Sequence, residues 1–152
     1  MGLDMYAGIA AKKEKEKEYH WDIKFTWRKH AKLQQYMMIL WHKKENLRLL
    51  EEAEHGQIIL EHDGSFSMGE QGFNAGDVLE LTEEDILKLK QLVMHDKLPT
   101  APSGFFWGLE FQDETAKDYM ERDLDFCEWA LDMFAQAKKN NEDIKIFYES
   151  SW

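Results

Sequence analysis

The feature that most constrains this chain is the amphipathic stretch Phe25–Lys44, FTWRKHAKLQQYMMILWHKK. Its large apolar residues recur every three or four positions and therefore share one face of a helix: Leu33, Tyr36, Met37, Leu40 and Trp41. Thr26 has a side chain that caps helix N-termini, so we predict a helix over Trp27–Lys44. Glu45–Glu54 continues the helical pattern, and Gly56 is expected to end it.

The start of this predicted helix is rich in cations. Arg28, Lys29 and Lys32 lie in its first two turns, where free backbone N–H groups and the helix dipole already concentrate positive charge. A cation at such a position costs a few tenths to about 1 kcal/mol, and a bound anion would offset that cost. We therefore predict an anion-binding site at the helix start. The alternative is that these side chains extend into water or pair with the many carboxylates of the chain.

The composition predicts one folded domain, residues 1–152. Hydrophobic residues make up 43% of the chain and aromatic residues 13%, which is enough for a packed core. A net charge of −11 argues against binding to nucleic acid or to an anionic membrane through the overall field. The single cysteine, Cys127, excludes an internal disulfide and favours a reducing compartment. The sequence has neither an apolar run of membrane-spanning length nor a basic start, so we expect a cytoplasmic protein without a signal peptide.

Alternation of apolar and polar residues predicts several strands. Gly2–Ala11 alternates with a period of two, and so does Tyr19–Phe25, whose apolar residues stand at the odd-numbered positions on one face. These two segments are expected to pair as a hairpin. Further strands are predicted at four places along the chain: Gln57–Leu60, Val78–Leu81, Phe105–Phe111 and Ile144–Tyr148.

Two more helices are predicted beyond the loop His62–Gly76. Thr82 and Asp85 have the spacing of a capping box, so a helix begins there. The last helix spans Ala116–Lys139, with Cys127 in its apolar stripe. Acidic residues form the opposite stripe of that helix: Asp118, Glu121, Asp125, Glu128 and Asp132.

Together these elements predict an α+β fold. We expect a mostly antiparallel sheet of about five strands, with about three to four helices packed mainly on one face. Short connections between strands and helices leave room for a parallel pair in the middle of the sheet. The sequence shows neither an internal repeat nor a second domain.

Four short segments resemble a family of small phage and bacterial proteins. They are MGLDMY at the N-terminus, WRKH at Trp27–His30, SGFFWG at Ser103–Gly108 and the terminal YESSW. A phosphoglycerate-kinase label attached to members of this family finds no support here, because the chain has no GxxxxGK[ST] loop and is too small for a two-domain kinase. The chain departs from the family pattern at Ala31, Lys32 and Gln34, where members have Pro or Asn and then His.

The resemblance implies a polar and aromatic set of ligand-binding residues within these segments. The set is Asp4, Tyr6, Trp27, Arg28, Lys29, Phe106, Trp107, Tyr148, Ser150, Ser151 and Trp152. An alternative for Trp107 and Trp152 is that they close the edge of the sheet.

Binding is favoured over catalysis. The six histidines are scattered without an HExxH pattern, and one cysteine allows no zinc site of the cysteine type, so no catalytic residue, metal or cofactor is predicted. We expect a small-molecule binding protein that captures an anionic, phosphate-bearing, nucleotide-derived ligand, and the phage resemblance suggests sequestration of a host immune signal. Two alternatives remain: an acidic interaction protein or nucleic-acid mimic, and a small hydrolase or transferase acting on a nucleotide-like substrate. A homo-oligomer is compatible with each.

Overall fold

The computed structural model describes residues 3–12, 17–54, 77–99 and 116–151, which form an α+β fold as predicted. Two predicted strands, Gln57–Leu60 and Phe105–Phe111, lie outside these residues, as does the predicted loop His62–Gly76. The helices and strands follow one another in this order: β1 (Asp4–Lys12), β2 (His20–Arg28), α1 (Ala31–Glu54), β3 (Leu79–Leu81), α2 (Glu83–Met94), α4 (Ala116–Asn140) and β4 (Asp143–Ser151).

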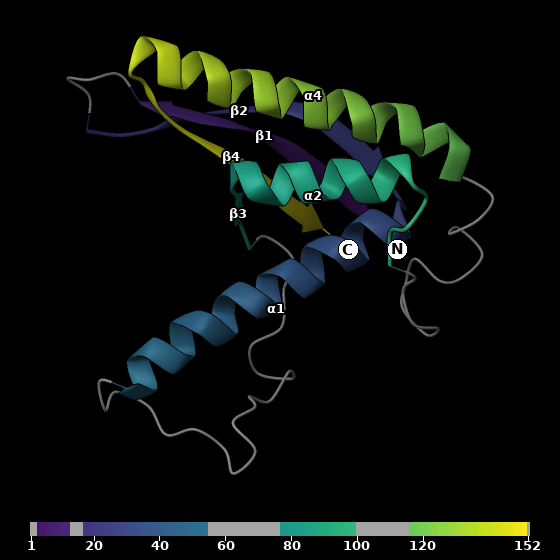
Figure 1. Ribbon diagram of the computed structural model, residues 1–152, viewed down its shortest axis with the longest axis horizontal. Coiled ribbons are helices and arrows are strands. Elements are labelled where there is room, and N and C mark those ends of the chain that lie inside the picture. Colours follow the sequence, from purple (N-terminus) through teal and green to yellow (C-terminus); the bar gives the residue numbers. More distant parts are fainter. Residues whose placement is uncertain (1–2, 13–16, 55–76, 100–115, 152) are drawn as a thin grey trace.

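The described part of the chain holds one sheet of four strands, in the order β2-β1-β4-β3. Every neighbouring pair is antiparallel, so the described sheet lacks the parallel pair that the sequence left open. The first and last strands of the chain lie side by side in the centre, with Asp4 opposite Ser151 and Lys12 opposite Asp143 (Figure 1). The prediction of about five strands and three to four helices compares with four strands and three helices among the described residues.

Helices α2 and α4 lie across one face of the sheet, and α1 starts at the sheet's end and extends away from it (Figure 1). The core forms between that face and the helices because alternate strand residues point toward them. Buried members of the core come from every described strand and helix: Leu3, Met5, Trp27, Leu33, Met37, Leu81, Ile86, Leu89, Phe126, Ile146 and Tyr148. Aromatic rings dominate the contact of β2 with α4, where Phe25 and Trp27 each lie about 5.5 Å from Phe126 between ring centres.

The start of α1 differs from the sequence prediction. Thr26 does not cap a helix, because β2 continues through Arg28 and pairs there with the first residues of β1. Lys29 then turns the chain with a positive φ of 57°, and its N–H donates to the Leu3 carbonyl at 2.8 Å. The helix begins at Ala31, so Arg28 and Lys29 precede it and only Lys32 of the three predicted cations lies in its first turn.

A β-bulge in β2 explains a second difference. Ala7 pairs with Phe25, but the next residue of β1, Gly8, pairs with Ile23, so Lys24 has no partner in the β1 ladder. The extra residue moves all preceding side chains of β2 to the other face of the sheet. The prediction that all apolar residues of Tyr19–Phe25 share one face is therefore wrong: Phe25 packs on α4, whereas Trp21 contacts Phe147 on the face without helices.

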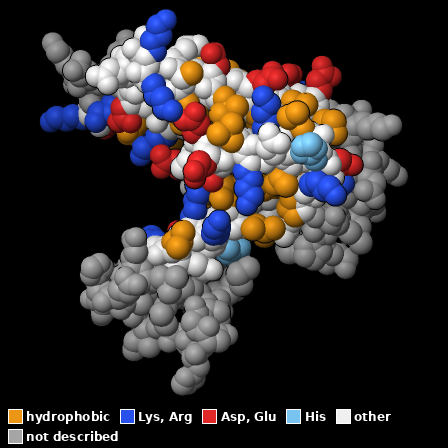
Figure 2. Space-filling view, viewed as in Figure 1, with side chains coloured by type: hydrophobic (Ala, Val, Ile, Leu, Met, Phe, Trp, Pro, Cys, Tyr) orange, Lys and Arg blue, Asp and Glu red, His pale blue; other side chains and the backbone are white. Residues whose placement is uncertain are grey.

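The sequence predictions for helices α2 and α4 are confirmed. Thr82 and Asp85 form the predicted capping box, with both reciprocal hydrogen bonds present. Cys127 is buried on α4, and the described acidic residues of the opposite stripe are exposed: Glu121, Asp125, Glu128 and Asp132. On the face of the molecule that carries these helices, acidic and basic side chains are interspersed with hydrophobic ones (Figure 2). None of the helices that the structure describes combines the length and the apolar character needed to cross a membrane.

Candidate functional site

A buried network of polar side chains joins the end of β2 and the start of α1 to α4. Asp123 on α4 accepts a hydrogen bond from Trp27 Nε1 to Oδ1 at 2.9 Å. Its other oxygen, Oδ2, lies 2.7 Å from Nε2 of His30. All three side chains are almost completely buried. A carboxylate in such a place requires partners, since an unpaired buried charge is costly.

The fold fixes the His30 ring from several directions. The His30 carbonyl accepts the first hydrogen bond of α1, from Gln34 N–H at 3.1 Å, which places His30 at the N-cap of that helix. The ring of Tyr119 stacks on the imidazole with 4.4 Å between centres and 13° between planes. The Tyr119 hydroxyl donates to the Arg28 carbonyl, so α4 is tied to the chain just before the helix start. The imidazole is therefore held by the carboxylate at its edge and by an aromatic ring on its face.

Two opposing effects act on the pKa of the Asp123 carboxyl. Burial raises the pKa of this carboxyl above its ordinary value, because the charged form loses hydration. The hydrogen bonds from His30 and Trp27, together with the charge of Arg122, act in the opposite direction on the same pKa. Arg122 itself donates to the Thr26 carbonyl at 2.8 Å, so it also belongs to the contact between β2 and α4.

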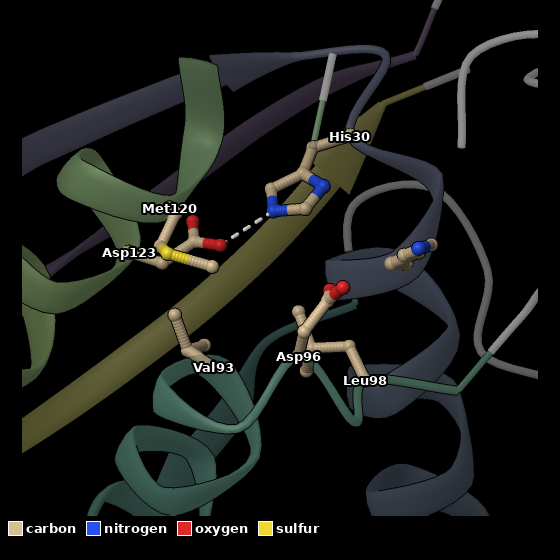
Figure 3. A pocket seen from close by; sticks show the side chains of 7 residues that line it. His30, Val93, Asp96, Leu98, Met120 and Asp123 are labelled. Carbon is tan, nitrogen blue, oxygen red and sulfur yellow. Dashed lines mark hydrogen bonds and ion pairs between the residues drawn. The ribbon is translucent and has the colours of Figure 1, made fainter. Parts of the chain in front are cut away.

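The network borders a small pocket at the start of α1 (Figure 3). We name it the α1 pocket; its lining residues are His30, Lys32, Val93, Asp96, Leu98, Met120 and Asp123. Asp96 reaches it because the chain turns directly after α2 with a φ of 52° at that residue. The cavity measures about 10 Å³, close to the space that one water molecule requires. It therefore has room for a single oxygen-sized group, with charged side chains beside it.

The ligand-binding residues implied by the resemblance lie in separate parts of the structure. Asp4, Arg28 and Ser151 meet at one end of the sheet, where Asp4 pairs in register with each of the other two. Arg28 Nε lies 3.8 Å from Asp4 Oδ1, and both side chains are exposed. An exposed pair at this distance contributes about 0–1 kcal/mol to stability. This end of the sheet adjoins the start of α1 through Lys29.

Other members of the set point to the inner face of the sheet. Trp27 donates to Asp123 and is buried, so its ring is not exposed at the surface to a ligand. Tyr148 is buried as well, and its hydroxyl donates to the side-chain oxygen of Gln34 on α1. Burial raises the pKa of Tyr148 well above its ordinary value, so the phenol stays neutral. Ser150 is buried two residues further along β4.

The remaining members lie elsewhere. Tyr6 is partly exposed on the face without helices, because its neighbours on β1, Met5 and Ala7, are buried on the inner face. Phe106, Trp107 and Trp152 lie outside the described residues. The structure thus brings the segments that carry Asp4, Arg28 and Ser151 together and separates them from the side chains of Trp27 and Tyr148.

Sequence reasoning missed His30 and Asp123 as a pair. A signal for Asp123 was present, because it stands three residues after Met120 and four before Cys127, on the apolar stripe of α4. A carboxylate at such a position requires a buried partner. The partner lies 93 residues away along the chain, and periodicity within one helix carries no information about it.

Comparisons with known proteins found no match to a protein-family model, to a curated protein or to a solved structure. Within the described ranges, no group of three or more His, Cys, Asp or Glu side chains could hold a metal ion.

Proposed function

We propose that this protein binds a small anionic, phosphate-bearing ligand at the α1 pocket. The observation that carries the proposal is the position of the buried His30–Asp123 pair at the N-terminus of α1, where it borders a cavity beside Lys32. A nucleotide-derived molecule is the first class to test, as the sequence suggests. Sequestration of a signal of bacterial defence is the biological role that fits the phage resemblance.

The start of α1 supports an anionic ligand. The first-turn N–H groups of a helix lack intrahelical acceptors and represent the positive end of its dipole. The first turn of α1 contains no acidic side chain that would neutralise this end, and it contains Lys32. Arg28 and Lys29 stand just before the helix and add positive charge. The start of α1 is thus a local concentration of cations in a chain whose net charge is −11.

The size of the cavity determines how such a ligand fits. A space of about 10 Å³ admits one oxygen of a phosphate group, so the rest of the ligand lies at the mouth. There it meets Lys32 and also Asp96, whose negative charge opposes an anion. We therefore propose Lys32 in place of Arg28 as the principal cation, because Lys32 lines the α1 pocket and Arg28 lies on β2. Trp27 supports Asp123 by donating a hydrogen bond to it.

Two measurements test this function. Mass spectrometry of small molecules released by heating the protein purified from cells should detect a phosphate-bearing compound. Calorimetric titration with inorganic pyrophosphate should show binding that Lys32→Ala weakens about 10- to 100-fold, the equivalent of one charge-assisted hydrogen bond. Asp96→Asn should strengthen the binding, because it removes an opposing charge.

Lys43→Ala is the matched control, since Lys43 is an exposed lysine on the same helix. It should leave the affinity for pyrophosphate unchanged. Equal effects of Lys32→Ala and Lys43→Ala would show that the anion responds to overall charge and does not bind in the α1 pocket.

Acid–base chemistry at His30 is a second candidate function. Asp123 fixes Nε2 of the imidazole, and the other ring nitrogen, Nδ1, lies on the side of the ring away from Asp123 (Figure 3). When Nε2 donates to the carboxylate, Nδ1 carries the lone pair and can accept a proton from water. Release of phosphate from p-nitrophenyl phosphate, abolished by His30→Gln with pyrophosphate binding retained, would establish a hydrolase. Binding without turnover would leave sequestration as the function.

A further inference from the structure

Two helix ends of opposite polarity meet at the α1 pocket. The start of α1 contributes His30 and Lys32 to its lining, and the end of α2 contributes Val93 and Asp96. The N-terminus of a helix is the positive end of its dipole, and the C-terminus is the negative end. The first turn of α1 contains no acidic residue, and the last turn of α2 contains no basic residue, so neither helix neutralises its own end. The pocket therefore has a positive and a negative side.

Charged side chains strengthen both sides of the pocket. Lys32 adds an ammonium group to the positive side, and Asp96 adds a carboxylate to the negative side. The Asp96 side chain is exposed and extends from the end of α2 toward His30 (Figure 3). The other carboxylate of the pocket, Asp123, already contacts Trp27 with one oxygen and His30 with the other. Asp96 is therefore the carboxylate that a ligand at the mouth of the pocket meets.

Asp96 stands where an aspartate is disfavoured in two ways. The turn after α2 is fixed by two backbone hydrogen bonds, from Asp96 N–H to the Val93 carbonyl at 3.1 Å and from Lys97 N–H to the Leu92 carbonyl at 2.8 Å. This Schellman motif holds Asp96 at a φ of 52°, in the left-handed region that favours glycine. Its negative charge also lies at the negative end of the helix dipole. Residues held in such unfavourable conformations cluster at ligand-binding and active sites.

A buried polar group also lines the cavity. His30 is 4% exposed, and within the described part of the chain the only hydrogen bond of its ring joins Nε2 to Asp123. Nδ1 lies on the other side of the ring (Figure 3). A buried ring nitrogen requires a partner, which a ligand or a water molecule in the cavity supplies.

We infer that the ligand of the α1 pocket is zwitterionic, an inference that rests on the proposed function. The phosphate of the ligand faces Lys32 and the start of α1, and a positively charged nitrogen faces Asp96 and the end of α2. Both charged side chains border one cavity of about 10 Å³, so a short linker joins the phosphate to the nitrogen. This ligand class gives Asp96 a role, whereas its charge would only weaken the binding of a purely anionic ligand.

Calorimetric titration of the full chain at pH 7 with two compounds that differ in one amine tests the inference. O-phosphoethanolamine carries an ammonium group two carbons from its phosphate, and ethyl phosphate lacks that group. The wild-type protein should bind O-phosphoethanolamine about two- to fivefold more tightly than ethyl phosphate, which is the effect of one exposed ion pair. Asp96→Asn should remove the preference, because it weakens the binding of O-phosphoethanolamine and strengthens that of ethyl phosphate.

Two further variants complete the test. Glu84→Gln removes an exposed carboxylate at the other end of α2 and should leave the preference unchanged. Asp96→Gly should remove the preference as Asp96→Asn does. It should also raise the melting temperature by about 2–4 °C, because glycine suits the left-handed turn after α2.

The possible results separate this inference from the proposed function. Ethyl phosphate binding that Lys32→Ala weakens, without a preference for the amine, overturns the inference and leaves the proposed function standing. A preference that persists in both Asp96 variants overturns it as well, because the nitrogen then meets another group. No saturable binding of either compound or of pyrophosphate would reject the proposed function and the inference together.

Discussion

His30 and Asp123 are 93 residues apart in the sequence, and their side chains lie 2.7 Å apart in the fold, both almost completely buried. The pair connects the N-cap of α1 to the inner face of α4. Trp27 completes it by donating to the second carboxylate oxygen. The α1 pocket therefore depends on a contact between two elements that are distant in the sequence. A substitution that breaks this contact should lower the free energy of unfolding, which can be measured.

Asp123→Ala should lower the free energy of unfolding by about 3–5 kcal/mol, because it leaves two buried donors without their acceptor. Urea unfolding followed by circular dichroism measures this loss. Asp125→Ala is the control, since Asp125 is exposed two residues further along α4, and it should change stability by less than about 0.5 kcal/mol. Equal losses in both variants would show that the His30–Asp123 contact contributes no more to the free energy of unfolding than an exposed side chain does.

Two threonines distinguish the true helix cap from the apparent one. Thr82→Ala should cost about 0.5–2 kcal/mol, because it removes the side chain that accepts the Asp85 N–H at the start of α2. Thr26→Ala should cost less than about 0.5 kcal/mol, because Thr26 is an exposed residue of β2. Chemical denaturation of the two variants side by side measures the difference, and a larger loss at Thr26 would refute the helix start at Ala31.

Gly8→Ala should destabilise the sheet by about 2–3 kcal/mol or more, because a Cβ there would lie 2.0 Å from the Asp22 backbone carbonyl oxygen, which cannot rotate away. Ala10→Gly in the same strand should cost only about 0.5–1 kcal/mol, through the added freedom of the unfolded chain. Thermal melts of both variants test the expectation. If Gly8→Ala melted like the wild type, β2 would have to pair with β1 without the bulge described above.

Cys127 should not react with Ellman's reagent at pH 8 in the folded protein. Burial raises the pKa of its thiol from 9.0 to about 12, so the reactive thiolate is not formed. The unfolded chain ionises at lower pH than the folded one, and stability should therefore fall as pH rises from 9 to 12. Addition of urea at pH 8 should make the thiol react at once. Fast reaction without urea would place Cys127 at the surface.

The parts of the fold that rest on local rules could be predicted from the sequence. The capping box of Thr82 and Asp85 lies within four residues, and it appears in the structure with both hydrogen bonds. The apolar stripe of α1 is likewise a property of one helix, and Leu33 and Met37 are buried as its spacing indicates.

Long-range pairing explains where the sequence reasoning failed. Thr26 and Trp27 are compatible with a helix start, and only the register with β1, which pairs Met5 with Trp27, extends the strand through Arg28. The bulge at Lys24 depends in the same way on Gly8 of the neighbouring strand. Such contacts join residues about twenty positions apart, beyond the range of any helical or strand period.

The candidate site was only partly visible in the sequence. The anion-binding site that was expected from Arg28, Lys29 and Lys32 stays a prediction, and of these three cations only Lys32 lies in the first turn of α1. His30 and Asp123 gave no paired signal, because a contact between two elements leaves no periodic trace in a single sequence.

A backbone amide NMR titration with inorganic pyrophosphate tests directly whether an anion binds at the α1 pocket. An anion at the α1 pocket should shift the amide signals of Lys32 and Leu33 most strongly, because first-turn N–H groups respond to a nearby negative charge, whereas the Ala31 N–H already donates to the Lys29 carbonyl. Lys32→Ala should reduce these shifts at equal pyrophosphate concentration, and Asp96→Asn should enlarge them. Shifts spread evenly over the exposed lysines, or no saturable shift at the start of α1, would show that the anion does not bind at the α1 pocket.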